Sequence, residues 1–400
     1  MRAETPVPEA ASPPQRHSAA SLATGARARG RAGEEAAPKK LLIVTDEMEV
    51  GGSQRQIAHF LKNLDRAHWQ PTLMYFRKRS FLVDELIAAG VEVIELPKRR
   101  RIDAGFAWNL ARALRRGRYD VVHCFSFTAE LWVRAVLWSA RGSAFVASVR
   151  GLCLDYSPWQ WRLKRWILAR ADAVVSNARA GAQETARRTG FPLERIEVIP
   201  NGIAPLARAV DRGALREQLG ATPGRSLGLF VGRLVPAKNV PLLLDALARI
   251  EPAQRPLLLV AGGGPLEAEL HAQSAALGLE RDLRLLGERS DSRQLMAAAD
   301  FLVLPSREEG MSNVLLEAME AGCAVLASDV GGNPEIVADG RTGLLFRSED
   351  AAQLAACMQA LSTDATLRAR LAAAASEQVR THYRIDALIR RTEAVYARIG

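Results

Sequence analysis

The chain has 400 residues, of which 48% are hydrophobic and 24% are charged. This length allows two or three domains with substantial cores, and the composition excludes a fibrous or wholly disordered protein. No apolar run reaches the length of about 18 residues that a membrane-spanning helix needs, and the N-terminus has no apolar stretch typical of a secretory signal. The four cysteines are scattered and form no CxxC pair, so we expect a cytoplasmic protein with reduced thiols rather than a disulfide scaffold or a zinc ribbon.

The net charge of +10 is unevenly distributed along the chain. Residues 1–200 carry +12, whereas residues 201–400 carry −2. All seven tryptophans lie in the first half, at Trp69, Trp108, Trp132, Trp138, Trp159, Trp161 and Trp166. A basic, tryptophan-rich half fits an anionic partner such as an acidic membrane surface, although a solvated surface around core tryptophans explains the same charge. No nucleic-acid-binding motif accompanies the basic residues, so we expect no nucleic-acid partner.

The ordered part of the chain is predicted to begin at Lys39. Residues 1–38 are rich in Ala, Pro, Arg, Ser and Gly and lack periodic apolar residues, which predicts a disordered tail. A buried strand is expected at Leu41–Thr45 and an amphipathic helix at Gln54–Leu64. Further strands are predicted at Pro71–Phe76, Val91–Leu96, Asp120–Cys124, Ala144–Val149, Ala173–Ser176 and Glu197–Ile199. This alternation predicts a first α/β domain over residues 39–203, with a parallel sheet covered by helices on both faces.

A second alternating series follows an interdomain segment over residues 204–225. Its strands are predicted at Leu227–Val231, Leu257–Ala261, Leu283–Leu286, Phe301–Leu304, Ala324–Ala327 and Gly343–Phe346. Helices are expected between them at Val240–Ile250, Leu266–Leu277, Asn313–Ala321 and Ala351–Leu361. We therefore predict a second doubly wound domain over residues 226–380, and a C-terminal helix over 381–400 that packs back toward the first domain. In such sheets ligands bind beyond the carboxyl ends of the strands, and a cleft between two such domains is the expected site.

The segment EEGMSNVLLEAMEAG, residues 308–322, carries the strongest chemical signal. Glu309 lies in the loop after a predicted strand, and the following helix should begin near residues 312–314. Glu317 is roughly two turns further on and can project to the same side. Carboxylates accept hydrogen bonds from hydroxyls, and the free amides of a helix N-terminus bind anions, so the pattern suits a sugar–phosphate ligand. A solvated pair of glutamates beside a core helix would have the same spacing.

Two further glycine-containing loops follow predicted strands. In VGRLVPAKN, Gly232 ends a strand, and the cations of Arg233 and Lys238 bracket a loop that suits a pyrophosphate. Gly51 and Gly52 follow the first strand and allow close backbone approach to a ligand. Two solvated loop cations remain an alternative for the first loop. A complete GxGxxG, a Walker motif, HExxH and GxSxG are all missing from the sequence, which argues against dehydrogenase, P-loop, zincin and hydrolase functions.

These three motifs, in this order, resemble the retaining glycosyltransferases of family 4, also called group 1 glycosyl transferases. Recurrent segments of that family are similar to residues 171–178, 198–203, 300–310 and 331–346 of this chain. The resemblance covers about residues 40–380. It implies the GT-B fold, in which two doubly wound Rossmann-like domains face each other across a deep cleft.

The resemblance also assigns roles to matching positions. Arg233 and Lys238 would bind the donor diphosphate and stabilise the leaving nucleotide, and Glu309 would contact hydroxyls of the transferred sugar. Glu317 would hold the ribose hydroxyls. The other expected donor-binding residues are Gly51, Gly52, Gly232, Arg289, Gly310, Asn313 and Val314. No metal site and no cofactor are expected, because positioned cations and helix amides can stabilise the leaving diphosphate electrostatically.

The sequence departs from the family pattern at two places. Many members have a His after the strand that we predict at Ala144–Val149, whereas this chain has Arg150. His123, at the end of another predicted strand, is the alternative cleft residue, although a satisfied histidine at a strand end would look the same. Arg150 and His123 are therefore candidates for contact with the acceptor or the sugar. Ala204 stands where the family's PNGxD segment has its Asp.

The predicted function is transfer of a sugar from a nucleotide diphosphate sugar to a saccharide or lipid-linked acceptor, in cell-surface polysaccharide or glycolipid biosynthesis. The alternatives are a GT-B sugar-nucleotide epimerase and a non-catalytic sugar-nucleotide-binding scaffold. An epimerase would release free sugar without an acceptor. A scaffold would be marked by loss of the motif residues, which are all present.

A membrane-facing surface is also expected in the first half of the chain. A helix over residues 157–172 has a predicted capping box of Ser157 and Gln160, and we expect Trp159, Leu163, Trp166 and Ile167 on one face. Basic residues lie around that face and again at 98–101 and 112–118. Trp with Arg and Lys is typical of helices in a membrane interface, although the tryptophans could instead pack on the sheet. We expect peripheral association with an anionic inner membrane surface.

Overall fold

The computed structural model describes residues 16–17, 37–206 and 210–400. The described residues form two compact units, one that ends at residue 146 and includes Gly400, and one that runs from residue 147 to residue 399. Most of the predicted tail over residues 1–38 lies outside the described residues. Within it, the two-residue strand β1 (Arg16–His17) pairs antiparallel with β4, a pairing that the sequence did not predict.

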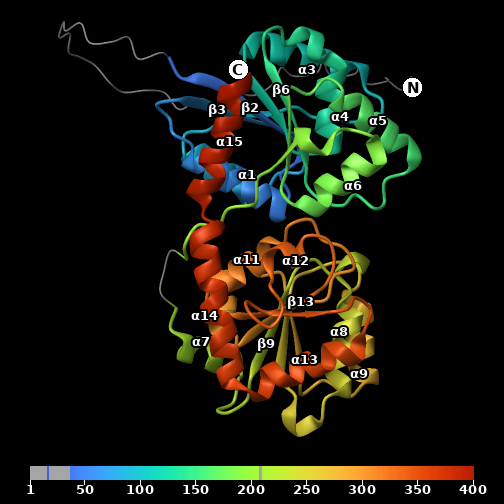
Figure 1. Cartoon of the computed structure of the whole chain (residues 1–400), viewed down its shortest axis with the longest axis vertical. Coiled ribbons are helices and arrows are strands. Elements are labelled where there is room, and N and C mark those ends of the chain that lie inside the picture. Colours follow the sequence, from blue (N-terminus) through green and yellow to red (C-terminus); the bar gives the residue numbers. More distant parts are fainter. Residues whose placement is uncertain (1–15, 18–36, 207–209) are drawn as a thin grey trace, which may run out of the picture. The chain divides into compact units, whose positions relative to one another are not determined.

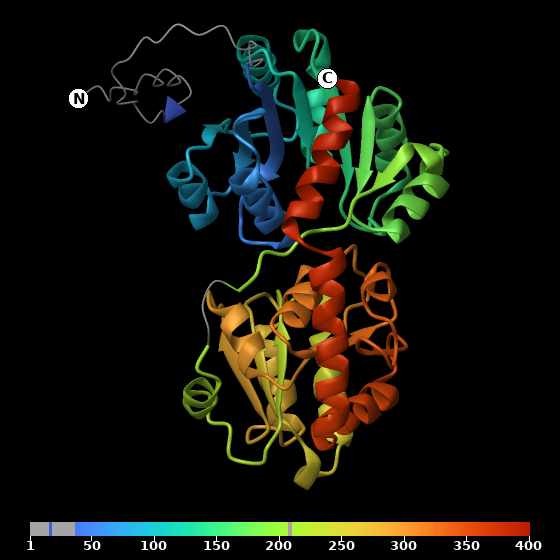
Figure 2. The ribbon, with the colours of Figure 1, turned by 60° about the vertical axis from the view of Figure 1, so that its left-hand side comes forward.

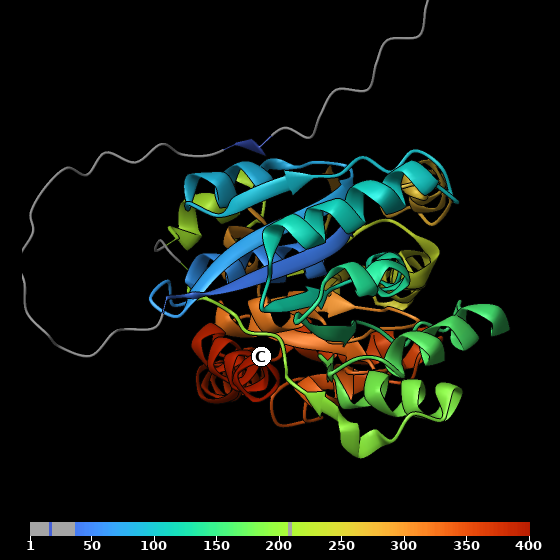
Figure 3. The same ribbon diagram turned by 90° about the horizontal axis from the view of Figure 1, so that it is seen from above.

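The first sheet contains every strand predicted before residue 200. Its strands are β2 (Lys39–Glu47), β3 (Trp69–Arg77), β4 (Glu92–Glu95), β5 (Val121–Cys124), β6 (Ala144–Val149), β7 (Ala173–Ser176) and β8 (Ile196–Val198), in the order β1-β4-β3-β2-β5-β6-β7-β8. The long neighbours β2 and β3 run parallel (Figure 3). Residues 41–44 of β2 are completely buried, as the apolar run predicts for a central parallel strand.

Helices alternate with these strands. They are α1 (Gly52–Asn63), α2 (Phe81–Ala88), α3 (Ala104–Gly117), α4 (Phe127–Val136), α5 (Pro158–Leu168) and α6 (Arg179–Thr189). The boundary between the two compact units falls within β6. Among the described residues, no helix is long and apolar enough to cross a membrane.

Helix α5 begins as predicted, but one of the four residues expected on a shared face is buried. Gln160 Oε1 accepts hydrogen bonds from the backbone N–H and the hydroxyl of Ser157, at 2.9 and 2.8 Å. Trp159 and Trp166 are exposed, so the alternative that they pack on the sheet is wrong, whereas Ile167, which was expected on the same face, is buried. Lys164 is also buried, because its ammonium donates to the carbonyl oxygen of residue 148 at 3.0 Å. Trp159 and Trp166 therefore lie on the outer side of α5.

The second sheet is parallel throughout and again contains every predicted strand. Its strands are β9 (Leu227–Val231), β10 (Leu257–Ala261), β11 (Leu283–Gly287), β12 (Phe301–Leu304), β13 (Ala324–Ser328) and β14 (Leu344–Phe346), in the order β11-β10-β9-β12-β13-β14. The accompanying helices are α7 (Arg212–Gln218), α8 (Val240–Arg249), α9 (Glu267–Ala276), α10 (Ser292–Ala298), α11 (Asn313–Glu320), α12 (Asn333–Ile336), α13 (Ala351–Thr363), α14 (Ala365–His382) and α15 (Ile385–Ile399). Helix α8 packs on α13, and α14 packs on α11 and β13 (Figure 1).

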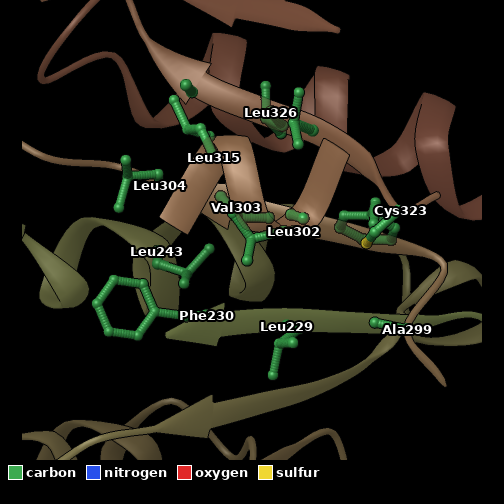
Figure 4. Close-up of a cluster of buried hydrophobic side chains, with 14 of the residues drawn as sticks. Leu229, Phe230, Leu243, Ala299, Leu302, Val303, Leu304, Leu315, Cys323 and Leu326 are labelled. Carbon is green, nitrogen blue, oxygen red and sulfur yellow. The ribbon is translucent and has the colours of Figure 1, made fainter. Parts of the chain in front are cut away.

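The core of this sheet anchors the elements that follow its strands. Leu229 and Phe230 of β9 and Leu302 of β12 are completely buried. Figure 4 shows Leu315, from the first turns of α11, directed toward the side chains of β12. Because Leu315 is also completely buried, the position of α11 is tied to the sheet by apolar packing.

The segment predicted as an interdomain connection contains helix α7. This helix packs on α10, and the guanidinium groups of Arg212 and Arg216 bond to the carboxylate of Asp300 at 2.6 and 3.0 Å. Asp300 precedes β12, so residues 211–218 are attached to the second sheet.

The C-terminal helix α15 follows α14 after a short break, as Figure 2 shows. At the break, Ile203 N–H donates to the carbonyl oxygen of Tyr383 at 2.7 Å, and Ile385 N–H donates to Ile203 O at 3.2 Å. A Cβ on Gly202 would lie 2.6 Å from the Cα of Ile385. Helix α15 is therefore held against the segment that leads into residue 203.

Candidate active site

The candidate site is built from loops at the carboxyl ends of β9, β10, β12 and β13. In a parallel sheet these loops emerge at one edge, where ligands bind. They cover residues 232–239, 262–266, 305–312 and 329–332. The first and third of these loops contain the motifs that the sequence singled out.

Glu309 and Lys238 form the charged centre of this edge. Lys238 Nζ donates to Glu309 Oε1 at 2.5 Å, and Ser306 Oγ donates to the same oxygen at 2.7 Å. The Glu309 side chain is only 10% exposed and that of Lys238 is 24% exposed. An ion pair that is half-buried and supported by a hydroxyl is held far more rigidly than a surface pair. The structure thus brings together two of the three predicted catalytic residues.

The third predicted catalytic residue, Arg233, lies in the same loop as Lys238 but is exposed. Within the described part of the chain, its side chain makes no hydrogen bond or ion pair. Arg289, predicted to bind the donor, instead bonds to Asp291 in its own loop at 2.8 and 2.6 Å. This contact raises the pKa of the Arg289 guanidinium. The roles of Arg233 and Arg289 stay predictions.

The loop that contains Glu309 rests on the loop after β13. A Cβ on Gly331 would lie 1.9 Å from the carbonyl oxygen of Glu309, and a Cβ on Gly332 would lie 1.9 Å from that of Gly310. Gly332 N–H also donates to Glu309 O at 3.3 Å. Only glycine permits this approach, so Gly331 and Gly332 fix the backbone of Glu309. Residues 331–346 resemble a recurrent segment of the family, but nothing in the sequence indicates that Gly331 and Gly332 support the site.

The loop that contains Arg233 rests in the same way on the loop after β10. A Cβ on Gly262 would lie 1.9 Å from the carbonyl oxygen of Gly232. Leu234 N–H donates to Gly263 O at 2.9 Å, and Gly232 N–H donates to Ala261 O at 3.0 Å. The glycine run at 262–264, which the sequence left without a role, therefore positions the predicted donor-binding Gly232.

Arg307 connects the two motif loops and was not predicted. Its backbone N–H donates to Ala237 O at 2.9 Å, and its guanidinium donates to Pro236 O at 3.2 Å and to the Glu349 carboxylate at 2.7 Å. The guanidinium lowers the pKa of Glu349. Arg307 thereby fixes the turn that carries Lys238 against the loop that carries Glu309. No local sequence pattern marks this residue.

The N-terminus of α11 also lies at the carboxyl edge of the second sheet. Ser312 is the N-cap, and its hydroxyl accepts from the backbone N–H of Leu315 at 3.4 Å. Asn313 and Val314 are the first residues of the helix, as predicted. Glu317, two turns along α11 from the loop of Glu309, is half-buried. Its predicted contact with a ribose stays a prediction.

The remaining candidates belong to the first sheet. Gly51 is the N-cap of α1 and Gly52 is its first residue. His123 lies on β5, is 1% exposed and has its ring 4.5 Å from that of Phe125. Arg150 follows β6, and its guanidinium donates to Asn201 Oδ1 at 3.3 Å. Burial lowers the pKa of Arg150 to about 10, so the group stays protonated at neutral pH.

Glu308, beside the catalytic candidate, has a raised pKa. Burial is the main cause, and the negative charges of Asp155 and Glu309 add to it, while Lys238 opposes them. Because the folded state holds this proton more tightly than the unfolded state, the contribution of Glu308 to stability is present at low pH and is lost as the pH rises through the raised pKa.

Replacing Glu308 by Gln should therefore stabilise the protein only where the native carboxyl is ionised. We expect the melting temperature of Glu308→Gln to exceed that of the wild type at about pH 8 and to match it at about pH 4. The matched control is Glu280→Gln at an exposed position, which should shift the melting temperature equally little at both pH values. A difference for Glu308→Gln that does not change with pH would contradict the assignment.

The next findings concern metal ligands and the similarity of the chain to known protein families. Among the described residues, no group of three or more His, Cys, Asp or Glu side chains could hold a metal ion. The model of the family "Glycosyl transferases group 1" matches residues 211–378, and that of "Glycosyltransferase Family 4" matches residues 50–205. Together these two models match the whole second sheet and the first sheet from β3 to β8.

Curated relatives and a solved structure agree with the family models. A D-inositol 3-phosphate glycosyltransferase of Nocardia farcinica is 36% identical over 50% of this chain and 47% of the relative. Another, of Actinosynnema mirum, is 30% identical over 71% of this chain and 74% of the relative. The chain thus spans from about half to three quarters of the length of these two relatives.

The crystal structure of Anabaena Alr3699/HepE in complex with UDP-glucose covers 90% of this chain and 99% of its own, with a TM-score of 0.80 and 24% identity. This likeness is one of fold, and it confirms the predicted two-domain α/β GT-B architecture. With the two family models and the relative from Actinosynnema mirum, it shows that the chain belongs to the family 4, group 1 glycosyltransferases.

Proposed function

We propose that this protein transfers a glycosyl group from a nucleoside diphosphate sugar to an acceptor hydroxyl, with retention of the anomeric configuration. The observation that carries the proposal is the Lys238–Glu309–Ser306 cluster beside the N-terminus of α11. It places a cation, a rigid carboxylate and the positive end of a helix dipole at the ligand-binding edge of one sheet. Family membership supports the same assignment.

Each group in the cluster has a chemical task in this reaction. When the bond between the sugar C1 and the diphosphate oxygen breaks, negative charge develops on the leaving nucleotide. Lys238, Arg233 and the positive end of the α11 dipole stabilise that charge electrostatically. Glu309 accepts hydrogen bonds from hydroxyls of the transferred sugar, and the leaving phosphate takes the acceptor proton. In this scheme the chain supplies the positive charge, and no metal or other cofactor takes part.

The relatives narrow the proposed substrates. The Anabaena structure contains UDP-glucose, and the curated relatives are named for D-inositol 3-phosphate. We therefore propose a UDP-hexose as the first donor to test, and a hydroxyl of a phosphorylated cyclitol, a saccharide or a lipid-linked glycan as the acceptor. Such products belong to glycoconjugate or cell-surface polysaccharide synthesis.

Donor binding tests the cluster directly. By isothermal titration calorimetry, one of UDP, GDP and ADP should bind the wild-type protein more tightly than the others. Lys238→Ala should weaken that binding about tenfold or more, because it removes a charge-assisted contact to a phosphate.

The control for this change is Lys62→Ala, since Lys62 forms an ion pair of the same type with Glu85 on the surface. This control should bind the nucleotide as the wild type does. Equal affinities of Lys238→Ala and Lys62→Ala would contradict the assignment of Lys238.

We further propose that the acceptor is presented at an anionic membrane surface. The segment 98–118 carries eight Lys and Arg side chains and one acidic residue. Its exposed apolar groups include Ile102, 86% exposed, and Trp108, 68% exposed. Helix α3 packs on the short turn that carries Trp138, which is 69% exposed. Exposed tryptophans among arginines fit a lipid–water interface better than a solvated surface.

Liposome co-sedimentation tests this surface without reference to activity. Binding should require anionic lipid, should weaken when salt is raised roughly tenfold, and should fall in Trp108→Ala. The control Trp161→Phe changes a buried tryptophan and should retain binding. Equal binding to neutral and anionic vesicles, or retention on RNA in place of vesicles, would contradict the proposal.

A further inference from the structure

The loop after β14 adds a carboxylate to the edge of the second sheet that carries the candidate site. This loop covers residues 347–350 and lies, like the two motif loops, at the carboxyl end of a parallel strand. Glu349 Oε1 accepts hydrogen bonds from Arg307 Nε at 2.7 Å and from Asn239 Nδ2 at 3.1 Å. A single carboxylate oxygen therefore joins the two loops that carry the charged centre of the site.

The turn that carries Lys238 is held on both sides of this residue. On the N-terminal side, the carbonyl oxygens of residues 236 and 237 accept hydrogen bonds from Arg307 at 3.2 and 2.9 Å. On the C-terminal side, Asn239 is 2% exposed and donates through its amide to Glu349. Both anchors depend on the Arg307–Glu349 pair, so this pair fixes the position from which the Lys238 side chain leaves the turn.

Two residues of this network have a left-handed backbone. Asn239 has a φ of 53° and a ψ of 39°, and Glu349 has a φ of +66°. Asparagine adopts this conformation readily, whereas a glutamate there costs free energy that a glycine would not. Backbone strain of this kind persists mainly where a side chain serves a functional site. The backbone at residue 349 favours glycine, and the chain nevertheless places a carboxylate there.

The stability of the fold does not explain this carboxylate. The side chains of Arg307 and Glu349 are 50% and 54% exposed, and an ion pair with that exposure contributes little to stability. What the pair supplies is geometry, because it holds the turn from which Lys238 Nζ reaches Glu309 Oε1 at 2.5 Å. The Lys238 ammonium has three N–H donors, and this contact uses one of them.

We propose that Glu349 is a positioning residue, which holds the turn of residues 236–239 so that the Lys238 ammonium meets the diphosphate of the donor. This inference rests on the proposed function, because it assigns a task at the same donor site. It deepens that function by making donor affinity depend on the loop after β14, which contains none of the residues that the sequence motifs assign to the donor.

Glu349→Gly tests the proposal most sharply. Glycine removes the carboxylate but adopts the left-handed backbone without strain. We expect the melting temperature to match or exceed that of the wild type, because the strain is relieved. By calorimetry, the dissociation constant of whichever of UDP, GDP and ADP binds most tightly should rise about fivefold, because Lys238 loses its fixed position. A residue that only stabilised the fold would lower the melting temperature and leave the affinity unchanged.

Two further variants separate the carboxylate from the backbone change. Lys78 also has a left-handed backbone, with a φ of +44°, is 59% exposed and pairs with Glu49 at 2.6 Å. Lys78→Gly therefore makes the same kind of change away from the donor site and should bind the nucleotide like the wild type. Glu349→Gln keeps an acceptor oxygen, on which both short bonds can end, and should bind within about twofold of the wild type.

A double-mutant cycle shows whether Glu349 acts through Lys238. If it does, adding Glu349→Gly to Lys238→Ala should change the dissociation constant by less than about twofold, because the group that Glu349 positions is already gone. A further fivefold loss in the double variant would mean that Glu349 acts on the nucleotide by another route, contrary to the inference.

The inference and the proposed function fail in different ways. If the wild type binds a nucleoside diphosphate and Glu349→Gly binds it equally well, or if that variant melts well below the wild type, Glu349 does not serve to position Lys238, and the proposed function is unaffected. If the wild type binds none of UDP, GDP and ADP and none of their sugars, the proposed function fails and the inference fails with it.

Discussion

Replacing Glu309 by Gln is expected to reduce kcat/KM for glycosyl transfer about 10²–10³-fold, the range seen when a single electrostatic contact in an enzyme site is removed. The substitution keeps the shape of the side chain but removes the charge that pairs with Lys238. One oxygen of Glu309 receives both the Lys238 ammonium and the Ser306 hydroxyl. The neutral amide would release the ammonium from its position and would bind sugar hydroxyls more weakly.

The control for this prediction is Glu85→Gln. Glu85 pairs with Lys62 on the surface of α1 and α2, where an ion pair contributes little. This variant should transfer sugar at the wild-type rate within a factor of about two. Equal losses in Glu309→Gln and Glu85→Gln, or none in either, would mean that the Lys238–Glu309 pair is structural.

The second large effect is expected from Gly331→Ala. Gly331 has a φ of +54°, and an added Cβ would lie 1.9 Å from the backbone oxygen of Glu309. A backbone oxygen cannot move aside as a side chain can, so the loop of Glu309 must shift. We expect the free energy of unfolding to fall by about 2–4 kcal/mol, and transfer activity to fall beyond what the loss of folded protein explains.

Gly340→Ala is the control for this prediction, because it adds a Cβ to a left-handed backbone without a steric clash. Gly340 has a similar φ of +67°, but no atom lies within 4 Å of the position that its Cβ would take. Urea unfolding should show a loss of about 1 kcal/mol for this control, from the left-handed conformation alone. If both variants lost a similar free energy of unfolding, the loop after β13 would be able to accommodate the added Cβ. That result would contradict the close contact between this loop and the backbone of Glu309.

The strands of both sheets were predictable because each is a short, nearly continuous apolar run. Residues 41–44 of β2 and 302–303 of β12 are completely buried, as strands covered on both faces must be. The burial of Ile167 and Lys164 on α5 was not predictable, because periodicity shows which residues share a side of a helix but not what that side contacts. Lys164 is buried on account of its bond to the carbonyl oxygen of residue 148, a tertiary contact that the helix sequence does not encode.

The charged residues of the site were predictable from the sequence, but the residues that hold them in position were not. Lys238 and Glu309 stood out because each follows an apolar strand and precedes a helix. The residues that hold the site in place contact other loops, and each has a partner that is distant in the chain. They are Gly331, Arg307 and Asn201. Asn201, for example, bonds to Asn313 across 112 residues. That contact joins segments that follow strands of different sheets, whereas Gly331 and Arg307 reach loops that one parallel sheet brings to the same edge. Neither kind of contact is encoded in a local sequence pattern.

Product analysis with a panel of UDP-, GDP- and ADP-sugars in the presence of EDTA is the most direct test of the central claim. Acceptors should include an inositol phosphate and simple saccharides, and the product's anomeric configuration is read by proton NMR. We predict acceptor-dependent release of one nucleoside diphosphate, a product of retained configuration, loss of transfer in Lys238→Ala, and unchanged transfer in Lys62→Ala. Release of free sugar without acceptor, turnover unaffected by Lys238→Ala, or no turnover with any donor would contradict it.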